Sequence, residues 1–257
     1  MRKIVIANQK GGVGKTTTAV NLAAGLALKG RRTLLIDMDP QANTTFAVLG
    51  AQLPKRSVYE LLIADDPLSS LIMSTGQPLL DIVPSTINLA GAEVELVTRV
   101  GGQTELRTKL AEAEPTLIYD YIIIDSPPSL GFLTINALAA SEEVIIPVST
   151  SIFALNGINM LENTIKKVRR SLNSPKLHIA GVLCTIYDNT NVARDVAAQT
   201  QQHFGDLVFK SIIPKNVKVE EAHSRSASVF AYADDSKGAE AYREFVEEIL
   251  SHEQENN

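Results

Sequence analysis

A glycine-rich segment after the first apolar run constrains the fold of this chain more than any other feature. The run Lys3–Ala7 leads to Lys10-Gly11-Gly12-Val13-Gly14-Lys15-Thr16-Thr17, and a helical pattern follows over Thr16–Lys29. Glycines let the backbone curl so that successive N–H groups point inward, and the positive end of the following helix strengthens that field. A strand, such a loop and a helix in this order predict a phosphate-binding loop in an α/β fold.

The residue types in this loop predict how it would hold a nucleotide. The Lys15 ammonium can reach the β- and γ-phosphates, and the Thr16 hydroxyl can ligate Mg²⁺. The strict pattern G-x-x-x-x-G-K-[ST] requires glycine at position 9, where Gln9 stands, and a second lysine, Lys10, precedes the glycines. The loop is therefore a variant, and its predicted nucleotide contacts are Lys10, Gly11, Gly12, Val13, Gly14, Lys15, Thr16 and Thr17.

Carboxylates stand at the ends of two further apolar runs. Asp37 and Asp39 follow Leu34-Leu35-Ile36, and Asp125 follows Tyr121-Ile122-Ile123-Ile124. Ligands of open α/β sheets bind at the carboxyl ends of the strands, so we expect these side chains to converge on the loop. Asp125 is the predicted Mg²⁺ anchor, and Asp39 is the candidate that orients an attacking water. The predicted metal set is Thr16, Asp39 and Asp125, and Lys15 and Asp39 are predicted catalytic residues.

Short β-branched runs alternate with longer helical patterns along the rest of the chain. Several runs are continuously apolar, which is typical of strands that helices cover on both faces. We expect one domain over residues 1–251, a doubly wound, mostly parallel sheet flanked by helices, followed by a polar tail at 252–257. The predicted strands are Lys3–Ala7, Thr33–Asp37, Leu80–Val83, Tyr121–Asp125, Glu143–Val148, His178–Thr185 and Leu207–Ile213.

Three segments together resemble one family. The segments Lys10–Thr17, Asp37–Asn43 and Asp125–Gly131 are similar to the deviant Walker A, switch I and switch II motifs of the ParA/Soj partition ATPases, in the ParA/MinD superfamily of P-loop NTPases. Weaker similarity at Ile87–Glu93, Leu133–Leu138 and Ile212–Val217 extends the resemblance over nearly the whole chain. It implies an ATP- and Mg²⁺-dependent ATPase that is slow without a partner protein.

The resemblance also implies a nucleotide-sandwich homodimer. By this resemblance Lys10 joins Lys15 and Asp39 in the catalytic set, because it would reach the ATP of the partner subunit. Gly11 would lie where the two subunits approach closely. Pro214 and Asn216 match the segment that lies against the adenine in the family. The implied cycle is dimerisation on ATP, binding of the dimer to double-stranded DNA without sequence preference, and release when a ParB-type centromere-binding protein stimulates hydrolysis.

Charge distribution bears on the DNA prediction. The net charge is −5, which taken alone argues against a nucleic-acid binder. From Asn163 to Val219, however, nine basic and three acidic residues give +6, which leaves −11 for the remainder. Arg194, Lys215 and Lys218 are the candidate DNA contacts. The family usually has an arginine within 185–191 and a Pro-Arg pair within 231–238, and this chain has neither, so the resemblance is weakest at the DNA contact.

Other functions are also to be weighed against this sequence. The same ATPase and DNA cycle could position a plasmid, a carboxysome or a chemoreceptor array, and a non-hydrolysing switch is also compatible with the motifs. A membrane-surface ATPase resembling MinD is disfavoured because the last helical segment, Tyr242–Leu250, has an acidic polar face. An iron–sulfur carrier is disfavoured by the single cysteine, Cys184. We expect no membrane partner and a cytoplasmic, nucleoid-associated protein.

Overall fold

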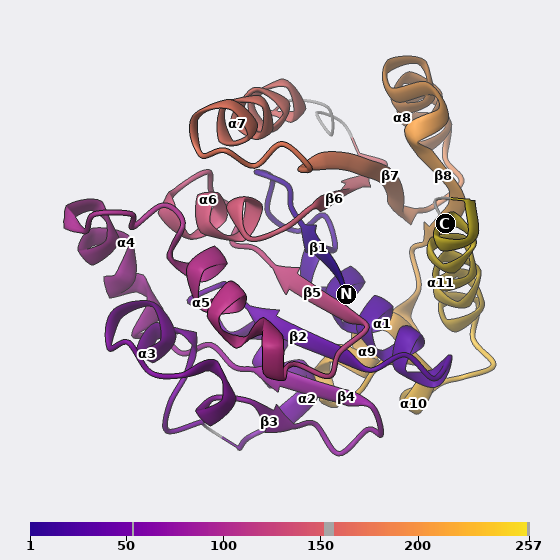
Figure 1. The fold of residues 1–257 in the computed structure, drawn as a ribbon. Coiled ribbons are helices and arrows are strands. Elements are labelled where there is room, and N and C mark those ends of the chain that lie inside the picture. Colours follow the sequence, from indigo (N-terminus) through magenta and orange to yellow (C-terminus); the bar gives the residue numbers. More distant parts are fainter. Residues whose placement is uncertain (53, 152–156, 256–257) are drawn as a thin grey trace.

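An eight-stranded sheet forms the centre of the molecule, with strand order β3-β4-β2-β5-β1-β6-β7-β8 (Figure 1). The computed structural model describes residues 1–52, 54–151 and 157–255. Neighbouring strands run parallel except for β3, which is antiparallel to β4. The predicted doubly wound, mostly parallel sheet is therefore confirmed.

The seven predicted strands are all present, with small differences at their ends. The strands are β1 Arg2–Ile6, β2 Thr33–Asp37, β3 Met73–Ser74, β4 Leu80–Val83, β5 Tyr121–Asp125, β6 Glu143–Ser149, β7 His178–Tyr187 and β8 Val208–Pro214. The α-helices are α1 Lys15–Leu28, α2 Asn43–Leu49, α3 Val58–Ile63, α4 Leu89–Thr98, α5 Glu105–Ala113, α6 Phe132–Ala139, α7 Ile158–Ser171, α8 Asn191–Phe204, α9 Val217–Ser224, α10 Val229–Tyr232 and α11 Lys237–Glu255. The strand β3 was not predicted, because two residues show no periodicity.

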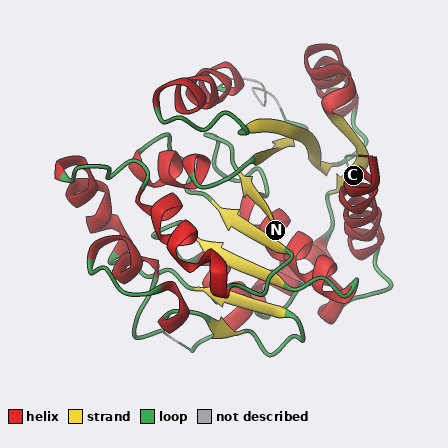
Figure 2. Cartoon of the chain, viewed as in Figure 1, coloured by secondary structure: helices red, strands yellow, loops and turns green. Residues whose placement is uncertain are grey.

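Helices cover both faces of the sheet, as the continuously apolar strands predict (Figure 2). One apolar core joins one face of the sheet to α3–α8, and the other core joins the opposite face to α1, α2 and α9–α11. Alternate residues of β5 enter alternate cores: Ile122 and Ile124 face the first, and Tyr121 and Ile123 face the second. The sheet is thereby held rigidly, so its carboxyl edge can position side chains for chemistry.

The chain end differs from the prediction. Helix α11 continues to Glu255, so residues 252–255 belong to the helix and not to a separate polar tail. His252 stacks on Phe209 with ring centroids 6.0 Å apart, and Glu253 forms an ion pair with Arg31 at 2.9 Å. These contacts to β8 and to the end of α1 explain why polar residues extend the helix. None of the helices within the described residues has the length and apolar character needed to cross a bilayer.

Candidate nucleotide site

The glycine-rich loop connects β1 to α1 at the carboxyl edge of the sheet. Gly12 and Gly14 have φ of +70° and +82°, which is the left-handed region where a side chain is strained. Val13 lies between them with its side chain buried, and its carbonyl accepts a hydrogen bond of 2.9 Å from Thr185 Oγ1 on β7. The loop is thus fixed in shape, and no side chain caps the N-terminus of α1 that follows it.

Lys15 is buried under this loop. Only 7% of the Lys15 surface is exposed, and its Nζ donates a hydrogen bond of 3.1 Å to the Lys10 carbonyl. Burial lowers the pKa of Lys15, while the nearby Asp125 and Asp39 carboxylates partly offset this effect. A hydrogen bond to a neutral carbonyl compensates poorly for the hydration that a buried ammonium loses. Lys15 is therefore suited to complete its contacts on a polyphosphate.

Asp125 is the centre of a hydroxyl and carboxylate cluster. Its Oδ2 accepts hydrogen bonds from Thr16 Oγ1 at 2.7 Å and from Thr44 Oγ1 at 2.6 Å. Its Oδ1 is buried and has no hydrogen-bond partner within the described residues. Burial raises the pKa of this carboxyl.

Hard oxygen donors of this kind fit Mg²⁺, which usually keeps several waters and takes the rest of its shell from phosphate. The described residues contain no group of three or more His, Cys, Asp or Glu that could hold a metal. A site with one carboxylate and one hydroxyl therefore fits an ion that arrives with a nucleotide. Thr44 is a member of the cluster that the sequence did not predict.

Asp37 and Asp39 have different surroundings. Asp37 pairs with Asp125 in the β2–β5 register, and its oxygens accept from Asp39 N, Thr45 N and Thr45 Oγ1 at 2.8–3.0 Å. Burial and the Asp125 charge raise the pKa of Asp37. Asp37 therefore fixes the backbone of the segment after β2. Asp39 Oδ1 accepts from Gln41 N at 2.9 Å, and the residue is 7% exposed.

A groove of about 330 Å³ lies over the loop, and Asp39 is part of its wall. The other lining residues include the loop glycines, Lys15, Thr16, Thr17, Gln41, Pro128 and His223. His223 comes from α9 and was given no role by the sequence; burial lowers its pKa. The predicted roles of Asp39 as metal ligand and water-orienting group stay predictions, but its position beside Lys15 and Thr16 is compatible with both.

A smaller hollow of about 90 Å³ adjoins the loop on its other side. Pro214 and Asn216 line it together with Gly14, Thr17 and Ile213. The Asn216 side chain also caps α9 by accepting a hydrogen bond of 2.8 Å from Lys218 N. A mostly apolar hollow next to a phosphate loop suits a nucleobase, and the family resemblance places the adenine at Pro214 and Asn216.

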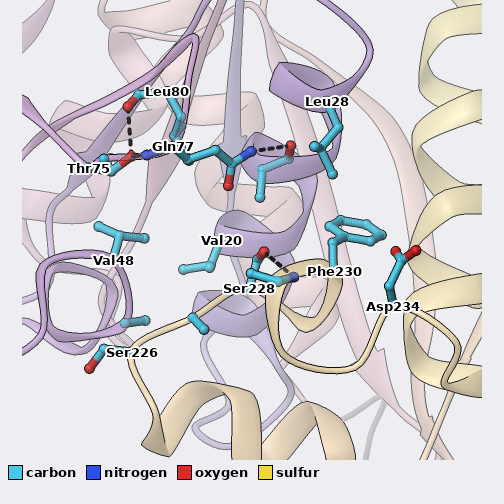
Figure 3. Close-up of a pocket in the computed structure, with 15 residues that line it drawn as sticks. Val20, Leu28, Val48, Thr75, Gln77, Leu80, Ser226, Ser228, Phe230 and Asp234 are labelled. Atoms are coloured by element: carbon cyan, nitrogen blue, oxygen red, sulfur yellow. Dashed lines mark hydrogen bonds between the residues drawn. The ribbon is translucent and has the colours of Figure 1, made fainter.

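A larger hollow lies apart from this site. It has a volume of about 610 Å³ and lies between α1, α2, the β3–β4 turn and α10 (Figure 3). Its walls are mostly apolar, with Val20, Leu28 and Phe230 among them. Its charged lining residue, Asp234, already forms an ion pair with Arg243 at 2.8 Å. This hollow offers nothing that would attract a polyphosphate.

Two side chains at the carboxyl edge connect neighbouring elements around the loop. Glu93 on α4 accepts hydrogen bonds from the backbone N–H groups of Phe132 and Leu133, at 2.9 and 3.3 Å, and so caps α6. Lys10 Nζ donates to Ser151 Oγ at 3.2 Å, which places the second lysine of the loop beside the end of β6. Gly11 is exposed, and a Cβ built there would have Pro128 Cβ, at 4.0 Å, as its nearest contact.

The candidate DNA contacts lie at the same edge but are not equivalent. Arg194 is exposed at the start of α8 and donates to the Asn189 carbonyl at 3.0 Å. Lys215 is exposed after β8, and its backbone N–H bonds to the Tyr187 carbonyl, so the two basic residues flank one surface. Lys218 is paired with Glu221 at 2.8 Å, which raises the pKa of the lysine and neutralises its charge locally. We call Arg194 and Lys215 the edge cations.

Comparison with known proteins bears on this site. The family described as "AAA domain" matches residues 1–179, and that of "4Fe-4S iron sulfur cluster binding proteins, NifH/frxC family" matches residues 129–256. A cluster needs four thiolates, whereas this chain has one cysteine, Cys184, whose burial raises its pKa to about 11. The second match therefore concerns the fold and not a cluster.

Two curated relatives and one solved structure are similar over almost their full lengths. The chain is 45% identical to the sporulation initiation inhibitor protein Soj of Bacillus subtilis, covering 96% of this chain and 98% of that one. It is also 45% identical to the chromosome-partitioning ATPase Soj of Thermus thermophilus, over 99% and 98%. The structure of cobyrinic acid a,c-diamide synthase from Mycobacterium smegmatis, with an ATP analogue and magnesium bound, superposes with a TM-score of 0.85 at 36% identity, covering 100% of this chain and 97% of that one.

Proposed function

The chain belongs to the ParA/Soj family of chromosome-partitioning ATPases, and we propose that it works as the ATP-driven switch of a DNA-segregation system. It is a P-loop ATPase that uses ATP and Mg²⁺. The observation that carries the proposal is the unpartnered Asp125 Oδ1 in the cluster with Thr16, next to Lys15 and the uncapped start of α1.

The residues divide the work of binding and hydrolysis. Backbone N–H groups of the loop and of the first turn of α1 hold the phosphates, and Lys15 neutralises their charge. Thr16 and Asp125 hold Mg²⁺, which when bound draws charge from the β- and γ-phosphate oxygens. Asp39 orients the attacking water from the groove wall, where Asp37 holds its backbone at 3.0 Å.

In the proposed cycle ATP drives two copies together. Lys10 then contacts the nucleotide of the partner subunit, and the dimer binds double-stranded DNA without sequence preference through the edge cations of both copies. A ParB-type protein stimulates hydrolysis, which separates the copies. The cytoplasmic, nucleoid-associated location follows from this cycle. A lipid surface is disfavoured as the matrix, because the apolar side chains Tyr242, Phe245 and Ile249 of α11 are buried in the core.

Trapping the ATP state tests this proposal. Asp39→Ala should bind Mg·ATP but hydrolyse it slowly, so light scattering after gel filtration should show a dimer with ATP and a monomer with ADP. Wild type with ADP is the control for the mass of the single chain. A monomer at saturating ATP would remove the sandwich dimer from the proposal.

A substitution at Gly11 should separate ATP binding from dimerisation. Gly11→Val should keep ATP affinity and change the free energy of unfolding by less than about 0.5 kcal/mol. The added Cβ makes only an ordinary contact with Pro128, and Gly11 is not among the residues with positive φ. ATP should no longer produce a dimer. Gly12→Val is the matched control: its φ of +70° makes a β-branched residue costly, by about 1 kcal/mol or more. A normal dimer in Gly11→Val would contradict the prediction.

A further inference from the structure

Helix α7 carries an exposed cluster of four cations. The basic stripe, as we name it, consists of exposed residues on the last two turns of the helix: Lys166, Lys167, Arg169 and Arg170. The opposite side of α7 is buried in the core through Ile158, Leu161, Ile165 and Val168. Within the described part of the chain, no carboxylate pairs with any of the four cations.

The helix itself does not account for this much charge. Cations in a last turn are stabilised by the helix dipole, which explains Arg169 and Arg170. Lys166 and Lys167 lie one turn earlier, where that effect has faded. The acidic residue of α7, Glu162, lies one turn before Lys166 on the same face, and its Oε1 is 3.6 Å from His203 Nε2 of α8 rather than in an ion pair with one of the four cations. Four like charges side by side repel one another, and an anion bound between them would relieve this repulsion.

The basic stripe is separate from the edge cations, although the sequence places both in one basic segment. Helices α7 and α8 each connect parallel strands, so both run from the carboxyl edge of the sheet toward its amino edge. Arg194 lies at the start of α8, and His203, which contacts α7, lies about 13 Å further along at 1.5 Å per residue. The basic stripe, on the last two turns of α7, lies beyond that contact toward the amino edge of the sheet, away from the nucleotide groove.

We infer that the basic stripe is a second contact surface for the DNA backbone, one that acts with or without nucleotide. The inference takes double-stranded DNA from the proposed function but does not depend on the dimer. The stripe is fixed to the core and lines neither the phosphate groove nor the adenine hollow. Its charge is therefore presented equally in every nucleotide state and gives the single chain a weak, salt-sensitive affinity for phosphate backbones. DNA is favoured over a lipid surface because the apolar side of α7 is buried in the core, and its exposed side, apart from Met160, carries charged and polar side chains.

The experiment compares three variants on a random-sequence duplex by fluorescence anisotropy, without nucleotide, with ADP and with ATP, over a range of salt concentrations. The stripe variant replaces all four cations with Gln, a good helix former. The edge variant carries Arg194→Gln and Lys215→Gln. The control variant removes four exposed cations from other surfaces: Arg32→Gln, Lys55→Gln, Lys210→Gln and Lys237→Gln. Circular dichroism confirms that each variant is folded.

The stripe variant should lose at least about tenfold in nucleotide-free affinity at low salt, and its slope of log affinity against log salt should fall by about 3 to 4. It should keep the increase that ATP produces, whereas the edge variant should lose that increase. A stripe variant that behaves like the control variant, or a wild type that binds DNA only with ATP, overturns the inference and leaves the proposed function standing. Wild type that binds no duplex in any state overturns both. Binding to anionic phosphatidylglycerol vesicles but not to DNA through the stripe would assign it to a membrane instead.

Discussion

Lys15→Ala should weaken the binding of Mg·ATP by about 100-fold or more, while the nucleotide-free protein remains as stable as wild type or becomes more stable. A charge-assisted contact in a water-poor site contributes roughly 3 kcal/mol, which is more than two orders of magnitude in affinity. Without nucleotide, the buried Lys15 ammonium donates a hydrogen bond to the Lys10 carbonyl, and burial lowers its pKa. Its removal therefore relieves a desolvation cost in the free protein.

Calorimetric titration with Mg·ATP and thermal unfolding without nucleotide measure the two effects. Lys29→Ala is the matched control, since Lys29 follows the other end of the same helix and is paired at the surface with Glu247. That variant should bind ATP normally and change stability by less than about 1 kcal/mol. Affinity of Lys15→Ala within fivefold of wild type would contradict the assignment of Lys15 to the phosphates.

Asp125→Asn should abolish most Mg²⁺-dependent hydrolysis, by about 100-fold or more, and yet stabilise the nucleotide-free protein at alkaline pH. Asp125 and Asp37 are both fully buried neighbours, and burial raises the pKa of each. A raised pKa means that the folded protein holds protons that the unfolded chain has already released. Stability therefore falls as pH rises above about 4, the ordinary carboxyl value, and the cost is fully present once both carboxyls are ionised.

Replacing Asp125 with the neutral amide removes this cost, and Asn Oδ1 can still accept from Thr16 and Thr44. At pH 8 the variant should gain at least about 1.4 kcal/mol in the free energy of unfolding, the equivalent of one pKa unit, and the gain should shrink toward pH 5. Urea unfolding at several pH values checks this, with the exposed Asp235→Asn as control. Parallel stability curves for wild type and Asp125→Asn would show that the buried pair carries no such cost.

The sheet and the core of the nucleotide site could be predicted because their signals are local. A glycine-rich loop between a strand and a helix has few other uses, and runs such as Tyr121-Ile122-Ile123-Ile124 identify central strands by composition alone. Asp125 followed from its place at the end of such a run. Asp39, Pro214 and Asn216 lie at positions compatible with their predicted roles, and these roles remain predictions.

Features that depend on tertiary contacts were missed. Helix α2 begins Asn-Thr-Thr, which has weak helix propensity, and Thr44 acquires its role only because the sheet places Asp125 beside it. The basic segment from Asn163 to Val219 is continuous along the chain, but the helix directions divide it into the edge cations and the basic stripe. The polar chain end became helical through contacts with Phe209 and Arg31 that are distant in sequence.

The helices that begin near the nucleotide groove differ in how their first turns are satisfied. Glu93 caps α6, Thr190 caps α8 and Asn216 caps α9, each with an oxygen of the protein itself. Helix α2 has neither a side-chain cap nor an acidic residue in its first turn, and the same is true of α1, which follows the glycine-rich loop. The backbone N–H groups in the first turn of α1 are therefore available to bind a phosphate. In the proposed function the phosphates of the nucleotide cap α1, so the free energy that elsewhere stabilises a helix end contributes here to ligand binding.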